Sequence, residues 1–242
     1  MRIATTQFTC APADIGANAR QMAALAAEAG AQGAEMVVFP ELAPTGYELE
    51  ALRADRDLWV QPDDPRLDPL RTGGIATVIN CATATGGNRP AIETLVFAAD
   101  GEPITAYRKQ HLFEHEQGVF LAGRNDGRFE LGGLRFALAT CFDNHFPDLV
   151  SRGAADGCHV HLASSLYGVG GGVSELESVY PGIAKDFPLH VVLANHVGPA
   201  GAWTGCGRAA LWAPGGAVLA QGDAETPTVV TAEVGPAPGP QG

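Results

Sequence analysis

Short apolar runs alternate with polar turns along most of the chain, and this pattern predicts an α/β fold. RIATTQF at 2–8 and EMVVF at 35–39 have the pattern of strands. Between them, residues 14–34 carry apolar side chains at helical spacing, which predicts an amphipathic helix. The apolar side of this helix holds Ile15, Ala19, Met22 and Ala26. Further strand-like runs lie at 133–142, 158–165 and 189–197.

Two glycine-containing turns indicate hairpins between neighbouring strands. One is Asp100-Gly101, within the two β-patterned runs of 91–109, and the other is the Pro-Gly-Gly turn within 208–221. Strands therefore outnumber clear helices. We expect sheets that pack on each other and are covered by helices on the outside.

The chain shows no strong internal boundary. Its 242 residues, 46% of them hydrophobic, can bury a large core, and the Pro and Gly residues are scattered in short turns. Only the last segment, GPAPGPQG, is low in complexity. We expect a single domain over residues 1–235 and a disordered tail over 236–242.

The charge and the cysteines limit the classes of partner and compartment. A formal net charge of −12, with no cluster of basic residues, argues against binding to nucleic acid or to an anionic membrane surface. No run approaches the roughly 20 apolar residues of a membrane span, and no signal peptide precedes the first strand. Five widely spread cysteines fit reduced thiols. These features predict a cytoplasmic protein.

Three polar residues follow predicted strands, where α/β proteins commonly hold their chemistry. They are Glu41, Lys109 and Cys141. Taken singly, each has an ordinary interpretation: a solvated carboxylate, a surface ammonium, and a small buried thiol. Taken together, they indicate nucleophilic catalysis, because a thiol with a pKa near ~8.5 needs a base or a positive charge to act as a nucleophile at neutral pH. A glutamate and a lysine would supply both.

The segments around these residues resemble the three signature segments of the nitrilase, or carbon-nitrogen hydrolase, superfamily. In order, they are FPELAPTGY at 39–47, YRKQHLF at 107–113 and CFDNHFPDL at 141–149. The resemblance extends over nearly the whole chain and implies an α/β fold of the four-layer αββα sandwich type. It also implies a catalytic triad of Glu41, Lys109 and Cys141. The form of the first segment looks more like amidases and carbamoylases than true nitrilases.

The resemblance implies further roles around this triad. Glu116, in EQGVFLAG, corresponds to the second glutamate of the family, with Glu114 as a rival and a salt-bridged loop carboxylate as the ordinary alternative. The backbone N–H of Phe142 would join Lys109 in stabilising an oxyanion. Glu41 would take the thiol proton and later protonate the leaving nitrogen. No metal and no organic cofactor is required.

The substrate implied is a small amide or N-carbamoyl compound, cleaved through a thioester that releases ammonia or an amine. The expected pocket residues are Tyr47, Asn144, His145, Ser165 and Tyr167. Small aliphatic amides, ω-amides of dicarboxylic acids and N-carbamoyl amines remain open. Two other functions also remain open: a non-catalytic binding or regulatory member of the same fold, and an acyltransferase in which an amine replaces water.

Some segments depart from the family pattern. Residues 53–80 look short and lack a clear helix, so part of one outer layer is expected to be reduced. Phe146-Pro147 is expected to stop regular structure after the cysteine, and the glycine-rich run 168–175 to form a flexible active-site flap. By resemblance, the protein is expected to be a homodimer, although it lacks the long C-terminal tail of many relatives.

Overall fold

The computed structural model describes residues 1–236. The predicted disordered tail, 236–242, lies outside the described residues except for its first position. The described strands are β1 (Arg2–Phe8), β2 (Met36–Val38), β3 (Ala76–Thr83), β4 (Ala91–Phe97), β5 (Pro103–Arg108), β6 (Gly127–Leu131), β7 (Leu134–Thr140), β8 (Val160–Ser165), β9 (His190–Ala200), β10 (Trp203–Cys206), β11 (Ala210–Trp212), β12 (Val218–Gln221) and β13 (Thr228–Glu233). The described α-helices are α1 (Ile15–Ala31), α2 (Leu49–Ala54), α3 (Asp68–Arg71), α4 (Pro147–Ala155) and α5 (Gly171–Asp186).

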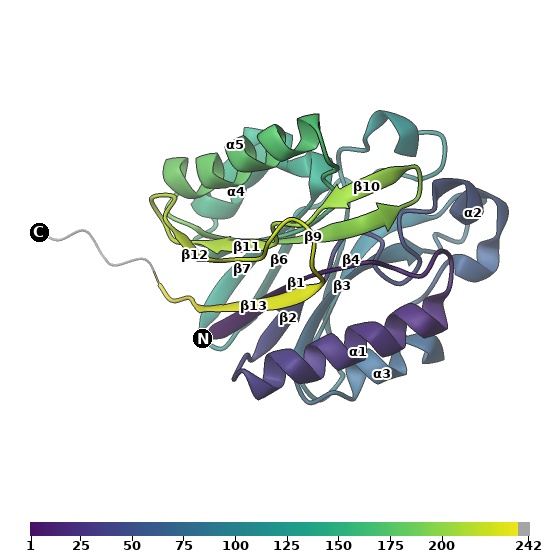
Figure 1. The fold of residues 1–242 in the computed structure, drawn as a ribbon, viewed down its shortest axis with the longest axis horizontal. Helices are drawn as coiled ribbons and strands as arrows, with labels where there is room; N and C mark the ends of the chain where they lie inside the picture. Colours follow the sequence, from purple (N-terminus) through teal and green to yellow (C-terminus); the bar gives the residue numbers. More distant parts are fainter. Residues whose placement is uncertain (237–242) are drawn as a thin grey trace, which may run out of the picture.

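The strands form two facing layers that join along one edge. The ladder runs β5-β4-β3-β2-β1-β9-β8-β7-β6, with β13 beside β1 and the β11-β12 hairpin beside β9. The layers meet where Gln7 of β1 pairs with Asn195 of β9 and Phe8 pairs with His196. Helices α1 and α3 cover one layer, and α4 and α5 cover the other (Figure 1). The predicted four-layer αββα sandwich is therefore confirmed.

Alternation along the strands explains these layers. Ile3 and Phe136 point into the core between the two sheets, whereas their neighbours Ala4 and Ala137 point outward, toward α1 and toward α4 and α5. Successive side chains of a strand face opposite sides, so a strand covered on both faces must be apolar at nearly every position. The eight residues of β3 are all buried, as this geometry requires.

Helix α1 follows the sequence prediction closely. Its buried side includes the four apolar residues expected there, and the Asp14 carboxylate accepts a hydrogen bond from the Ala17 N–H at 2.9 Å. This contact satisfies one of the free N–H groups of the first turn. Both predicted hairpins also form, as β4-β5 and β11-β12.

Two local predictions were wrong. Regular structure does not stop at Phe146-Pro147, because α4 begins at Pro147, where the first turn of a helix needs no N–H donor. The glycine-rich run does not form a flap alone, because its second half opens the 16-residue helix α5 at Gly171. Between residues 49 and 71 the outer layer holds only short helices, including the four-residue α3, as the reduced pattern of that region indicated.

Candidate active site

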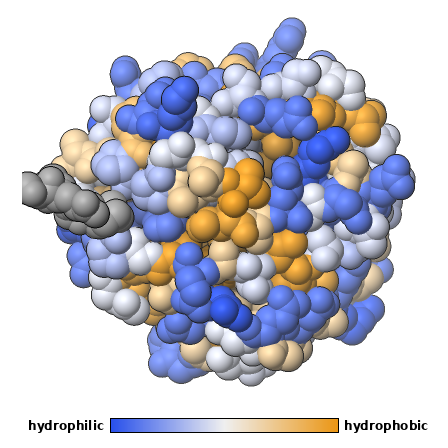
Figure 2. All heavy atoms as spheres, turned by 60° about the vertical axis from the view of Figure 1, so that its left-hand side comes forward, coloured by the Kyte–Doolittle hydropathy of each residue, from blue (hydrophilic) through white to orange (hydrophobic). Residues whose placement is uncertain are grey.

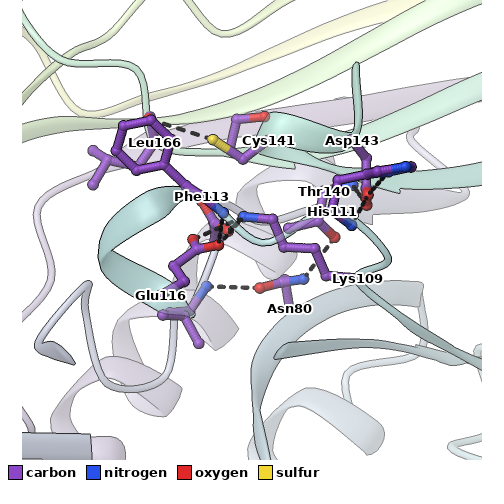
Figure 3. Close-up of polar contacts among 12 residues, drawn as sticks. Asn80, Lys109, His111, Phe113, Glu116, Thr140, Cys141, Asp143 and Leu166 are labelled. Carbon is purple, nitrogen blue, oxygen red and sulfur yellow. Dashed lines mark hydrogen bonds and ion pairs between the residues drawn. The ribbon is translucent and has the colours of Figure 1, made fainter. Parts of the chain in front are cut away.

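Three buried ionisable side chains meet below the pocket. Lys109 follows β5 directly, and its Nζ lies 2.7 Å from Glu41 Oε1 and 2.8 Å from each carboxylate oxygen of Glu116. All three side chains are 0% exposed. Figure 3 shows the Lys109 side chain reaching toward Glu116, with the sulfur of Cys141 beyond them.

Glu41 is held by hydrogen bonds to its backbone. Its carbonyl oxygen lies 2.6 Å from Nε2 of His196 on β9, and its N–H donates to the Ser165 carbonyl of β8 at 3.4 Å. The next residue, Leu42, adopts a left-handed φ of 51° and donates its N–H to Asn80 Oδ1. Segments far apart in sequence thus fix where the carboxylate points.

Glu116 rather than Glu114 enters this cluster. It ends a short 3₁₀ turn, Glu114–Glu116, in which Glu114 is exposed and Glu116 is buried. Besides Lys109, its carboxylate accepts hydrogen bonds from the Tyr47 hydroxyl and the Phe113 N–H, each at 2.7 Å. Charge-assisted bonds of this kind hold a carboxylate in one orientation.

The charges of the cluster do not balance. Two carboxylates face one ammonium, so full ionisation leaves one excess negative charge in a buried site, which is costly. Burial raises the pKa of Glu41 from 4.5 to about 8; the charge of Lys109 opposes this shift and that of Glu116 reinforces it. Burial alone would lower the pKa of Lys109, but the charges of Glu41 and Glu116 outweigh it and keep that pKa high. Among the described residues, Glu41 Oε2 is buried without a hydrogen-bond partner, so it is free to exchange a proton.

Cys141 begins the turn that follows β7. Its φ of 46° lies in the left-handed region, where a side chain with a Cβ is strained, and such strain is typical of functional positions. Its Sγ lies 3.6 Å from the Leu166 carbonyl oxygen, as Figure 3 shows. Burial raises the pKa of the thiol well above its usual range; the charge of Glu41 raises it further, and that of Lys109 lowers it. The resting sulfur is therefore a thiol that needs a base.

Asp143, two residues after the cysteine, joins the nucleophile turn to the lysine segment. Its carboxylate is fully buried and accepts hydrogen bonds from several groups. These are the Thr140 N–H, the Tyr107 hydroxyl, the Gln110 N–H and the His111 N–H, with His111 Nδ1 a further 3.0 Å contact. The bonds fix Cys141 and Lys109 relative to each other.

A pocket of about 440 Å³ opens above the cysteine. Of the five predicted pocket residues, Tyr47, His145 and Tyr167 line it, together with Cys141 and Phe142. The other two, Asn144 and Ser165, are not among the lining residues, and their placement does not support substrate contact.

The side chains of Asn144 and Ser165 are already engaged by the protein. Asn144 Nδ2 donates to the Cys141 carbonyl at 2.9 Å, and its Oδ1 lies 2.7 Å from His161 Nε2. Ser165 Oγ bonds the Tyr180 hydroxyl at 2.7 Å. Both residues therefore support the site from within the protein.

Sequence reasoning missed three residues on the pocket wall: Phe113, Glu175 and Trp203. Phe113 closes the YRKQHLF segment, so its nearness to Lys109 was a usable signal. Glu175 ends the glycine-rich run that was expected to form an active-site flap, but nothing singled it out within that run. Trp203 carried no comparable signal, since only the folding of β10 brings it to the pocket.

The chain belongs to the carbon-nitrogen hydrolase family, whose model matches residues 2–237. It is 30% identical over 236 residues to hydrolase Rv0480c of Mycobacterium tuberculosis, covering 91% of this chain and 81% of the relative. It is 31% identical over 142 residues to the 2-oxoglutaramate amidase of Bacillus subtilis, covering 54% of this chain and 52% of the relative.

A solved amidase from Nesterenkonia sp. AN1 superposes with a TM-score of 0.89 at 27% identity, covering 98% of this chain and 90% of that chain. In that mutant structure, the acetamide moiety of fluoroacetamide is bound covalently to the active site cysteine. With the family match, these similarities establish a hydrolase of the nitrilase superfamily with amidase relatives.

No described helix is long and apolar enough to cross a membrane. The described His, Cys, Asp and Glu side chains form no cluster of three or more that could hold a metal ion.

Proposed function

We propose that the protein hydrolyses small amides through a thioester on Cys141, with Glu41, Lys109 and Glu116 as its catalytic acidic and basic groups. One observation carries this proposal: a buried lysine bonded to two carboxylates lies beside a partly exposed thiol at the floor of a pocket. The covalent adduct on the cysteine of the Nesterenkonia amidase supports the same role for Cys141.

In the acylation step, Glu41 Oε2 takes the thiol proton while the sulfur attacks the amide carbon. A C–S bond forms, and the carbonyl electron pair moves to the oxygen. The positive charge of Lys109 and the N–H of Phe142 stabilise that oxyanion in surroundings with little water, where such interactions are strong. When the carbonyl reforms, the C–N bond breaks, and Glu41 returns its proton to the leaving nitrogen.

In the deacylation step, Glu41 accepts a proton from water, and the resulting hydroxide attacks the thioester. The C–S bond breaks, the acid leaves, and the proton returns to the sulfur. Glu116 keeps Lys109 charged and fixed through both steps. Its hydrogen bonds to Tyr47 and Phe113 support this positioning role.

An ammonia-release screen over small amides, N-carbamoyl compounds and nitriles tests the proposal. We expect turnover of small amides by the parent protein and none by Cys141→Ala. Cys158→Ala is the matched control, because Cys158 is a buried cysteine that does not line the pocket. Equal ammonia release by Cys141→Ala and the parent would refute the nucleophile assignment.

Adding a primary amine to the same assay separates hydrolysis from acyl transfer. Hydrolysis yields the free carboxylic acid whether or not amine is present, whereas a transferase yields the new amide. Mass spectrometry of the products distinguishes the two. The absence of any turnover, combined with tight amide binding, would instead favour a binding protein.

Homodimer formation stays part of the proposal. The face shown in Figure 2, on the side where β12 lies in Figure 1, carries apolar side chains near its centre among polar ones. On β12, Val218 and Leu219 are 53% and 42% exposed, which is high for large apolar residues. Sedimentation equilibrium tests the assembly, and a monomer at assay concentrations would refute it.

A further inference from the structure

The wall of the pocket carries an uneven set of charges. Among the described residues that line it, Glu175 is the one carboxylate, and neither Arg nor Lys is present. The catalytic Lys109 lies beneath the pocket floor with its charge already paired by two carboxylates. Apart from the imidazole of His145, a carboxylate on a substrate would therefore meet no described side chain on the wall that can carry a positive charge.

Glu175 has freedom to interact with a ligand. It lies one turn into α5, on the same helical face as Gly171, which also lines the pocket. Its side chain is 60% exposed, and its Oε2 lies 3.9 Å from His145 Nε2. That distance exceeds a hydrogen bond, so the carboxylate keeps its acceptors available.

The N-terminus of α5 works in the opposite direction, because helix N-termini attract anions. Their effective charge is about half a positive elementary charge, whereas an ionised glutamate carries a full negative one. Both lie at the same part of the pocket wall. The larger charge decides the sign, so the field at this wall favours a cation.

Aromatic groups line the same pocket as Glu175. Phe113 and Phe142 stand edge to face at 5.5 Å on the wall, and Trp203, 43% exposed, lines the same pocket. Aromatic faces attract ammonium groups and also cover the methylene chain that carries them. A carboxylate among aromatic rings is a typical setting for binding an organic cation.

We propose that Glu175 makes the pocket select amides by the charge at the end remote from the amide group. This inference rests on the amide hydrolysis proposed above. The pocket favours amides that end in an ammonium group, accepts neutral amides, and rejects those that end in a carboxylate. The ω-amides of dicarboxylic acids, a class that includes the 2-oxoglutaramate named for the Bacillus relative, are therefore poor substrates of this chain.

Three amides of matched length test this selection: valeramide, its δ-amino derivative, and glutaramate, the monoamide of glutaric acid. The assay measures kcat/KM at low ionic strength and about pH 8, where imidazole groups as a class carry little charge. The Coulomb energy between two unit charges roughly 6 Å apart near a protein surface is large enough to alter kcat/KM about tenfold. We expect the parent to prefer the amino derivative over glutaramate by at least about tenfold.

Variants of α5 assign the selection to one residue. Glu175→Gln should reduce the preference about tenfold, and Glu175→Lys should reverse it in favour of glutaramate. Glu177→Gln is the matched control, because Glu177 lies on the same helix and is 53% exposed but does not line the pocket. Its preference should equal that of the parent. Added salt should weaken the preference of the parent protein.

The outcomes distinguish the two proposals. If valeramide is hydrolysed but glutaramate is an equal or better substrate, the charge selection is refuted and amide hydrolysis stands. The selection is also refuted if Glu175→Gln leaves the preference unchanged. If no amide is turned over, hydrolysis is refuted. Calorimetric binding of the same three compounds to Cys141→Ala then decides the selection, which fails if glutaramate binds as tightly as the amino derivative.

Discussion

Replacing Glu116 with Gln should shift the pH dependence of catalysis toward lower pH. In the proposed mechanism the base is ionised Glu41, so kcat/KM rises with pH through the pKa of Glu41, which lies at about 8. The negative charge of Glu116 helps to raise that pKa. Gln keeps the shape of Glu but lacks the charge. Ionised Glu41 is then easier to form, and the rising limb moves to lower pH.

The geometry sets the size of this shift. Glu41 and Glu116 each contact the same Nζ, at 2.7 and 2.8 Å. The tetrahedral spread of ammonium hydrogens then places the two carboxylates roughly 4–5 Å apart. At an effective dielectric constant of about 20, like charges at that separation repel by about 4 kcal/mol, which corresponds to two to three pKa units. Relaxation of side chains and water reduces this, so we expect a shift of about one to two units.

The maximal kcat/KM is a poorer measure of the charge effect than the pH at which the rising limb of the profile lies. A Gln at 116 cannot accept from every donor around it, because Lys109 Nζ contacts both carboxylate oxygens and would face the NH₂ group in either orientation of the amide. The maximal kcat/KM should therefore fall as well. The assay is a pH–rate profile of parent, Glu116→Gln and Glu114→Gln, the last being an exposed neighbour on the same turn. A limb that stays in place or moves to higher pH in Glu116→Gln would refute Glu41 as the titrating base.

Four further predictions address the same site and the residue that supports it. Glu41→Gln should lower amide turnover by about 10²–10⁴-fold or more. It should still trap an acyl group on Cys141 from an activated ester, which mass spectrometry detects as added mass. Amide turnover within about tenfold of the parent would contradict the role of Glu41. The same variant should remove a pH dependence of stability: folding raises the pKa of Glu41 from 4.5 to about 8, so its contribution is present at low pH and lost as pH rises through that window. Urea unfolding from about pH 5 to about pH 9 measures it, and a parallel loss in the variant would exclude Glu41 as the source. Lys109→Arg should not restore activity, because a planar guanidinium is wider than an ammonium and would not fit between the two carboxylates; near-parental kcat would mean that only positive charge matters. Asp143→Asn should destabilise the fold by about 2–4 kcal/mol, because its NH₂ group would face N–H donors that now bond a carboxylate; an unchanged melting temperature would contradict this.

The sequence determined the layers of this protein and the three residues at their ends. Strand β1 and helix α1 follow from the local pattern, because β1 is a short run buried on both faces and α1 repeats its buried residues at helical spacing. Glu41, Lys109 and Cys141 stand out for the same reason. Each is a polar residue placed after a predicted strand, and the order of their segments made the family recognisable.

Only the tertiary structure decided which side chains face the pocket. Asn144 stands three residues from Cys141 and looked like a substrate contact, but its amide is already hydrogen-bonded to the Cys141 carbonyl and to His161. Trp203 looked unremarkable and yet lines the pocket, because β10 carries it there from a distant part of the chain, and the start of α5 selects Glu175 from the glycine-rich run. Local periodicity specifies the face on which a residue lies. Which donor and acceptor it meets depends on how separate elements pack, and that information is spread over the whole chain.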